Sequence, residues 1–316
     1  SFPSIHWGGS SNRYECTMDL QSPAQTPEPN SQSYSPHPKS CALSRLGFWR
    51  SLAAKAGAQD PPLSNPSGLC LSVVIPAYKE PDAVLQAIRT ASTNMQSQLR
   101  AEFIVAVVDD MTNQKLQYCE IPITIVRCAS GRSAALNAGA AKARGDVLVF
   151  LHADCQLPRY WDWEVRAAVC RPGLIAGAFN FDVDFEGKPA PVGIDGLIRM
   201  TEFRSRYLQL PYGDQALFIS MDRFRKLGGF ANMPLMEDYE FVCRLRRASL
   251  HASYATNKEV RVAILPVSAK CSARRWTKQG VIMNTLINQT IVGLYYYFGF
   301  NPATLYSLYY GRRVGA

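Results

Sequence analysis

The segment Ala135–Pro158, ALNAGAAKARGDVLVFLHADCQLP, contains the pieces of an α/β unit in order. Residues 131–144 are alanine-rich and favour a helix, which Gly145 ends. Val147–Leu151 is a continuous apolar run, typical of a strand buried on both faces. His152 and Asp154 follow this run directly. Because ligands of parallel sheets bind at the carboxyl ends of the strands, the stretch predicts both a fold class and an edge for the site.

The same alternation of strand and helix extends in both directions from this segment. Upstream, we predict strands at 71–75, 103–108 and 123–126. We also predict one helix at 80–98, which Glu80-Pro81-Asp82 opens. Downstream, the pattern is mixed, with predicted strands at 179–185 and 260–265 and predicted helices at 192–209, 236–249 and 276–298. The order predicts an α/β protein with a doubly wound, mostly parallel central sheet flanked by helices.

Residues 1–68 differ from the rest of the chain. They are rich in Ser and Pro and have no apolar periodicity, so we expect a disordered leader without a packed core. Residues 46–58 are the one stretch in it that favours a short helix. A transit peptide for an organelle such as a plastid is the alternative interpretation. The predicted folded domain is therefore 69–311.

The distribution of charge and the cysteine content indicate which kinds of binding partner and which cellular compartment the sequence favours. The net charge is +9, and residues 241–316, where Glu259 is the single acid, carry the whole excess. Such a tail indicates either an anionic partner or a solvated basic face. The nine cysteines include no C-x-x-C pair, which disfavours a zinc ribbon and a disulfide scaffold and favours an intracellular, reducing compartment.

Acidic residues follow two of the predicted buried strands. Asp109 and Asp110 end one strand, and His152 and Asp154 end another. Carboxylates at these positions suit a divalent cation or a ribose hydroxyl, although a strand-end Asp can simply start a turn. Asp154 suits Mg²⁺ or Mn²⁺, and the nitrogen ligand of His152 suits Mn²⁺ better.

Further candidates lie at predicted helix starts and turns. Arg132 opens a helix, where N–H groups and a cation make an anion site. Glu237 and Asp238 open another, where they either complement the helix dipole or supply a rigidly placed general base. Arg274, Arg275 and Trp276 combine phosphate-binding guanidiniums with an indole, or form a solvated helix start. Residues 281–300 are mostly apolar and predict either an interfacial membrane segment or a helix that closes the core.

Taken together, these residues resemble glycosyltransferase family 2, of GT-A (nucleotide-diphospho-sugar transferase), Rossmann-like fold. They are most similar to its branch of radical-SAM/selenodomain-associated transferases 2. The resemblance covers residues 71–311 and rests on the strings SVVIPAYKE, ALNAGAAKARGDVLVFLHADCQLP, GDQALFI, GGFANMPLMEDYEFVCRLRR and RRW.

The resemblance implies transfer of a sugar, with inversion, from a nucleotide-diphosphate donor to an acceptor hydroxyl. It implies Asp154, with His152, as the metal-binding D-x-D-like motif for Mn²⁺ or Mg²⁺. It implies Asp238, with Glu237, as the catalytic base. The implied donor and acceptor contacts are Pro76, Glu80, Asp109, Arg132, Asp214, Gln215, Arg275 and Trp276.

The sequence also departs from the family pattern. Lys79 stands where Asn is usual, Met111 replaces the Gly of a D-G-S loop, and Ser272 replaces the Gln of Q-x-x-R-W. Ser272 argues against a processive polysaccharide synthase. A catalytically silent nucleotide-sugar- or membrane-binding module is the competing hypothesis. The chain lacks a recognised nucleic-acid-binding module, so we expect no nucleic-acid partner.

Overall fold

The computed structural model describes residue 63 and residues 65–96 and 100–311. The predicted helix at 46–58 and most of the predicted leader lie outside these residues, so the boundary at 68/69 stays a prediction. A short 3₁₀ turn (Pro66–Gly68) precedes the first strand.

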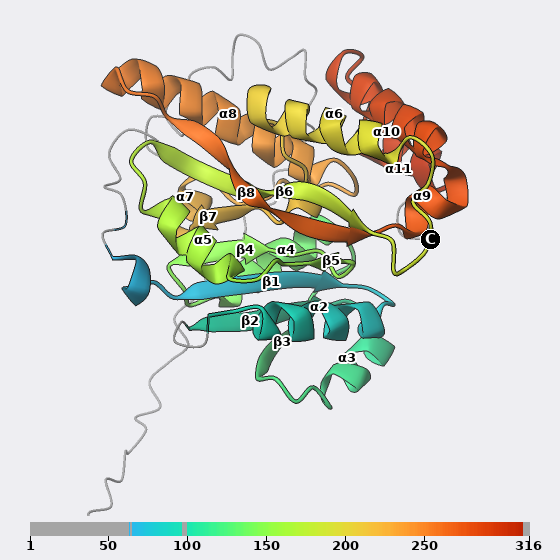
Figure 1. Cartoon of the computed structure of the whole chain (residues 1–316), viewed down its shortest axis with the longest axis horizontal. Helices are drawn as coiled ribbons and strands as arrows, with labels where there is room; N and C mark the ends of the chain where they lie inside the picture. Colours follow the sequence, from blue (N-terminus) through green and yellow to red (C-terminus); the bar gives the residue numbers. More distant parts are fainter. Residues whose placement is uncertain (1–62, 64, 97–99, 312–316) are drawn as a thin grey trace, which may run out of the picture. The chain divides into compact units, whose positions relative to one another are not determined.

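The central sheet has eight strands in the order β3-β2-β1-β4-β7-β6-β8-β5 (Figure 1). Its first half is parallel and consists of β1 (Leu71–Ala77), β2 (Ala101–Val107), β3 (Ile123–Arg127) and β4 (Val147–Phe150). In its second half, β7 is antiparallel to both neighbours, β6 and β8 are parallel, and β5 is antiparallel to β8. These strands are β5 (Cys155–Gln156), β6 (Leu174–Asp184), β7 (Phe218–Ser220) and β8 (Arg261–Ser272).

The apolar strands are buried on both faces, as their uninterrupted sequence predicts. In β1, Val73 and Ile75 belong to one hydrophobic cluster, and Val74 between them belongs to the other. The first cluster lies under α2 (Pro81–Thr93), α3 (Asp110–Leu116), α5 (Trp161–Val169) and α6 (Ile194–Tyr207). The second lies under α4 (Arg132–Lys142), α7 (Met221–Lys226) and α8 (Glu237–Thr256).

The C-terminal segment forms a third cluster. Ile291, Tyr295 and Leu305 pack against the loop before α8 and against Tyr239 at its start. They come from α10 (Val281–Tyr296) and α11 (Pro302–Tyr310), which follow α9 (Arg274–Gln279) and lie together in Figure 1. No helix in the described part of the chain combines the length and apolar character that crossing a bilayer requires.

The expected strand 260–265 and helix 236–249 extend further, to Ser272 and Thr256, and three other expected elements differ in kind or end. The predicted helix 276–298 is two helices, because Gly280 has φ 77°, which an α-helix does not accommodate. The helix expected to reach Gln98 ends at Thr93. The Asp109-Asp110 pair, expected as a strand end, also begins α3, because the Asp109 side chain caps that helix.

Candidate active site

The carboxyl ends of the parallel strands bring the predicted site residues to one edge of the sheet. Pro76 lies within β1 and Glu80 just after it, Asp109 follows β2, and His152 and Asp154 follow β4. Since β2, β1 and β4 are adjacent and parallel, these segments meet where the sequence predicted the ligand site.

Asp109 ties two of these loops together. One carboxylate oxygen accepts a hydrogen bond from the backbone N–H of Lys79 at 2.8 Å, and the other accepts from Thr112 N–H at 2.9 Å. Burial opposes ionisation, but these hydrogen bonds outweigh it and lower the pKa of Asp109. Lys79 has φ 55°, a left-handed conformation that Asn adopts more readily than Lys. The position where the family usually has Asn is therefore a strained one in this chain.

His152 and Asp154 lie with Cys155 in a compact group of metal-ligating atoms. One ligand atom from each of the three residues lies within 4.8 Å of the others. Burial, followed by the charge of Arg132, lowers the pKa of His152 to about 4, so its imidazole is neutral and able to ligate a metal. Nitrogen and carboxylate donors on one strand end fit a divalent cation, and the imidazole favours Mn²⁺ over Mg²⁺.

The 3₁₀ turn η2 (Gly213–Gln215) brings Asp238 to this group. The N–H of Gly213 donates to Asp238 Oδ2 at 2.9 Å, and the N–H of Tyr239 donates to Oδ1 at 2.7 Å. A Cβ atom at Gly213 would lie 2.7 Å from His152 Nε2 and 3.1 Å from Asp238 Oδ2. Residues of η2, of α8 and of the loop after β4 therefore converge around a position where an added Cβ would lie too close to two side chains.

Asp214 adds a third carboxylate to the same group. Its Oδ1 is buried, and no hydrogen-bond partner for it lies among the described residues. Burial, together with the charges of Asp238 and Asp154, raises the pKa of Asp214 to about 6, although Arg204 opposes the shift. A carboxyl group with an unfilled acceptor beside two other acids suits a ligand or a cation rather than a purely structural turn.

Glu237 is buried and forms an ion pair with Arg132 at the start of α4. Its Oε2 is buried as well and has no hydrogen-bond partner in the described structure. Arg132 in turn stays partly exposed, with 33% of its side chain accessible. Glu237 thus holds the Arg132 guanidinium near the site, and the neighbouring Asp238 lies in the site itself.

The basic residues of α9 lie near the proposed site. Arg274 lies 3.5 Å from Glu80 in an ion pair that joins the C-terminal segment to the end of β1. Arg275 is exposed, and its charge acts on the pKa values of His152 and Asp214. Trp276 packs edge-on against Phe181, with ring centroids 5.8 Å apart, so part of its indole closes the core.

Gln215 occupies a different environment from the one its resemblance implies. Its side chain is fully buried, and its amide donates to Phe179 O at 3.0 Å. Its Oε1 accepts from Ser205 Oγ at 2.8 Å and from Tyr212 N–H at 3.2 Å. Gln215 therefore fixes η2 in place from behind, and the adjacent Asp214 offers its carboxylate to the site.

Three residues of this region carried no signal in the sequence. The Arg204 guanidinium lies 3.4 Å from the Tyr212 ring centroid and also donates to Gln215. Cys271 lies opposite Cys155, with the two sulfur atoms 2.7 Å apart. Burial raises the pKa of Tyr310, and the charges of Arg132 and Arg275 oppose this shift.

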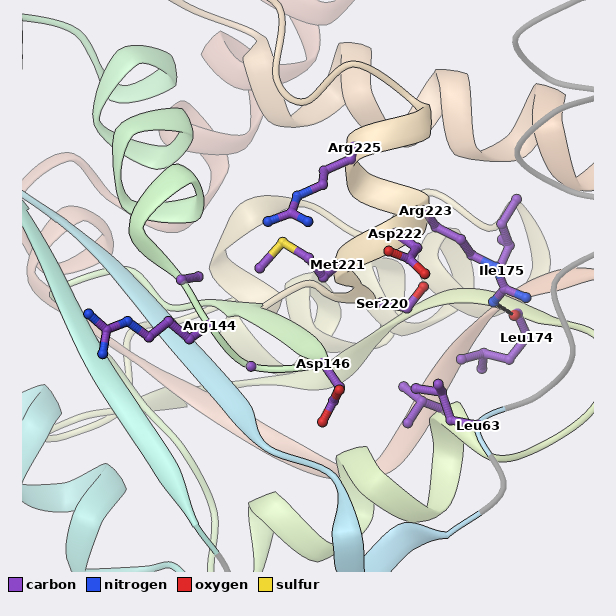
Figure 2. A pocket seen from close by; sticks show the side chains of 13 residues that line it. Leu63, Arg144, Asp146, Leu174, Ile175, Ser220, Met221, Asp222, Arg223 and Arg225 are labelled. Carbon is purple, nitrogen blue, oxygen red and sulfur yellow. Dashed lines mark hydrogen bonds between the residues drawn. The ribbon is translucent and has the colours of Figure 1, made fainter. Parts of the chain in front are cut away.

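A separate cavity of about 380 Å³ lies at the other end of β4 (Figure 2). Its lining includes Arg144, Asp146, Ser220 and Arg225, and Arg223 there donates to Leu174 O. Asp146 precedes β4 and Ser220 ends the antiparallel β7, so the cavity opens away from the carboxyl edge. None of the predicted site residues lines it.

The parallel unit β3-β2-β1-β4, continued by a mixed sheet and with acids at its carboxyl edge, defines the class of GT-A nucleotide-diphospho-sugar transferase folds. Residues 72–226 match the model of the family described as Glycosyl transferase family 2. Over these residues the chain carries a glycosyltransferase family 2 domain.

Curated relatives carry the same class in their names. The chain is 26% identical over 206 residues to an uncharacterized glycosyltransferase of Haemophilus influenzae, a match that covers 60% of this chain and 66% of the relative. It is 30% identical over 99 residues to the undecaprenyl-phosphate 4-deoxy-4-formamido-L-arabinose transferase of Pseudomonas fluorescens, covering 28% of this chain and 29% of that protein. The chain thus spans just under two thirds of the first relative and under a third of the second.

Two solved structures align with most of this chain at TM-scores below 0.5. The mannosyltransferase PcManGT from Pyrobaculum calidifontis, in complex with GDP-Man and Mn²⁺, aligns with a TM-score of 0.47 at 15% identity, over 78% of this chain and 71% of that one. S. aureus TarS 1-349, in complex with UDP, aligns with a TM-score of 0.49 at 12% identity, over 77% and 71%.

Proposed function

We propose that this chain is a metal-dependent inverting glycosyltransferase that moves a sugar from a nucleoside-diphosphate donor to an acceptor hydroxyl. Asp238 is the proposed general base. The observation that supports this most is the convergence of Asp238 with His152 and Asp154 around Gly213. It brings a fixed carboxylate next to metal-ligating groups, and the two sets of atoms come from elements far apart in the sequence.

Asp238 has the properties that deprotonation of a hydroxyl requires. Burial opposes its ionisation, but the nearby charge of Arg132 and the N–H groups of Gly213 and Tyr239 outweigh burial, so its pKa is lowered. It is therefore a carboxylate at neutral pH. The two N–H groups fix its orientation and leave lone pairs for the acceptor hydroxyl proton.

The other charged residues suit a departing nucleoside diphosphate. A Mn²⁺ or Mg²⁺ ion held by Asp154 and His152 would offset part of the developing negative charge. Arg132 and Arg275 add fixed positive charge from α4 and α9. We assign Pro76, Glu80 and Asp109 to the nucleoside, since Asp109 keeps acceptor capacity beyond its two backbone hydrogen bonds.

Replacing Asp238 by Asn tests this assignment, because the amide keeps the size but cannot take up a proton. We expect turnover of the donor sugar, measured against a panel of nucleotide sugars with Mn²⁺, to fall by about 10²–10⁴-fold. Binding of Mn²⁺ and nucleotide should persist. Asp195→Asn, in the first turn of α6, is the matched control for the loss of a helix-start acid.

Full turnover by Asp238→Asn would contradict the assignment. Metal-dependent nucleotide binding without turnover by any donor in the unaltered chain would support the alternative, a catalytically silent binding module.

We further propose that α10 contacts a membrane surface. Ile282, Met283 and Leu286 are exposed along this helix, and Tyr297 and Phe298 are exposed just beyond it. The neighbouring α6 exposes Met200 and Phe203. Apolar side chains on a helix with basic residues in the preceding α9 are typical of an interfacial contact with anionic lipid.

A reducing intracellular compartment is the proposed location. It is supported by the cysteines of the described residues, among them the close pair Cys155 and Cys271, which are free thiols.

A further inference from the structure

Cys155 and Cys271 form a buried pair of thiols beside the proposed active site. They lie directly opposite each other on the antiparallel strands β5 and β8. Their sulfur atoms are 2.7 Å apart, and the two side chains are 1% and 3% exposed. The proposed transfer reaction assigns a role to neither thiol, although the Cys155 sulfur lies within 4.8 Å of ligand atoms of His152 and Asp154.

The register of the two strands brings these cysteines close enough for a covalent bond. The N–H of Ser272 donates to Asp154 O at 2.9 Å, so these two residues form a hydrogen-bonded pair of the antiparallel ladder. Hydrogen-bonded and non-hydrogen-bonded pairs alternate, which makes Cys155 and Cys271 a non-hydrogen-bonded pair with Cα atoms about 4.5 Å apart. A disulfide needs Cα atoms roughly 4.4–6.8 Å apart, so the backbone does not have to move far.

The position of β5 gives an oxidant a route to the pair. This strand has two residues and is the last in the sheet order, so it pairs only with β8 among the described strands. A two-residue edge strand opens locally at little cost, whereas β8 is also held along β6. Transient detachment of β5 from β8 and α2 would expose Cys155 without unfolding the rest of the sheet.

The pair is connected to the proposed catalytic groups. Both thiols donate to the backbone carbonyl of Asp214, from 3.5 Å for Cys155 and 3.1 Å for Cys271. Asp154 directly precedes Cys155, and the N–H of Gly213, next to Asp214, holds Asp238. A bond between the sulfurs removes both S–H donors from the Asp214 carbonyl, so η2 loses two of its contacts.

We propose that Cys155 and Cys271 form a reversible disulfide that displaces η2 and lowers transferase activity, so that the dithiol is the active form. The effect on activity rests on the proposed function. The oxidant is a low-molecular-weight disulfide such as oxidised glutathione. The Cys155 sulfur attacks one glutathione sulfur and releases a glutathione thiol. The Cys271 sulfur then attacks Cys155 in the mixed disulfide and releases the second. Two protein thiols are oxidised, one glutathione disulfide is reduced, and both protons leave on glutathione.

The test is to equilibrate the full chain in glutathione buffers of increasing oxidising strength, block the remaining thiols and digest with trypsin. We expect a linked pair of peptides, residues 145–159 and 271–274, that dithiothreitol separates. We also expect donor turnover to fall several-fold as the linkage forms and to recover on reduction. Cys155→Ala and Cys271→Ala should each abolish this response, and Cys128→Ser, a half-buried cysteine elsewhere, should retain it.

Two results would overturn the proposal. One is that both thiols stay open to alkylation in the most oxidising buffer, while the exposed Cys70 becomes glutathionylated. The other is that the linkage forms and turnover stays constant. If the reduced chain turns over no donor at all, the proposed function fails, and the peptide linkage still decides whether the disulfide forms. Thermal unfolding of each Ala variant separates loss of the response from loss of the fold.

Discussion

Gly213 both packs closely against His152 and donates its N–H to the proposed base Asp238. Three separate segments of the chain meet here and bring together His152, Gly213 and Asp238. A methyl group added at Gly213 would lie 2.7 Å from His152 Nε2. Because the N–H of Gly213 also holds Asp238, any shift that relieves such a contact moves the proposed base.

Gly213→Ala should therefore lower donor turnover much more than it lowers stability. We expect a loss of at least about 10²-fold in turnover, since displacement of a catalytic group by about 1 Å costs this much. Gly196→Ala is the control, because a Cβ there meets no atom within 4 Å. It should leave turnover unchanged and stabilise α6 by roughly 0.5–1 kcal/mol. Equal turnover by the two variants would show that the close approach at Gly213 does not matter.

The Arg132–Glu237 pair gives a second prediction at this scale. Glu237 is 1% exposed, so removing Arg132 leaves a buried carboxylate without its counter-ion. We expect Arg132→Met to reduce the free energy of unfolding by about 3–5 kcal/mol, measured by denaturant titration. Adding Glu237→Gln should restore part of that loss, because the second change removes the unpaired charge. A double variant less stable than Arg132→Met alone would contradict this interpretation.

At the scale of elements, the break between α9 and α10 determines how the basic residues reach the site. Gly280 has φ 77°, and the turn it makes allows α9 to carry Arg274 toward Glu80 while α10 packs elsewhere. A continuous helix would carry Arg274 and Arg275 along the α10 axis.

Gly280→Ala should cost about 1–3 kcal/mol of stability, because φ 77° with ψ 152° is a conformation that is strained for a residue with a Cβ. It should also raise the KM for the donor, since α9 loses its fixed direction. Gly293→Ala, within α10 and with no atom within 4 Å of the added Cβ, should leave the KM for the donor unchanged and stabilise α10 by roughly 0.5–1 kcal/mol. If both variants bind donor equally well, the direction of α9 does not depend on the break.

The elements also show what the sequence could and could not predict. The strands β1, β2 and β4 were predictable because an apolar run buried on both faces leaves little other choice, and so was the edge bearing Asp109 and Asp154. The meeting of His152 with Asp238 was not, because it depends on how α8 and η2 pack against the sheet. The break at Gly280 was missed because one glycine in an apolar periodic stretch is also compatible with a continuous helix.

At the scale of the whole molecule, the proposed active site and the exposed apolar surface of α10 are two separate features. The proposed site lies at the carboxyl ends of the strands, and α10 buries Ile291 and Tyr295 while it exposes Ile282 and Leu286. A membrane contact through this surface would bring the site close to an acceptor in the membrane. The proposed transferase activity and the proposed membrane contact are therefore compatible, but each can be wrong without the other.

Vesicle sedimentation tests the membrane contact on the intact chain. We expect the protein to sediment with vesicles rich in phosphatidylserine, and less so with neutral ones or at high salt, since basic residues attract anionic lipid. Leu286→Asp should abolish sedimentation, because burial of this side chain in the interface is lost. Leu250→Asp is the matched control, since Leu250 on α8 is 60% exposed and Leu286 is 57% exposed. Equal sedimentation of the two variants would contradict the assignment of α10, whereas loss of sedimentation with donor turnover retained would separate the membrane contact from the chemistry.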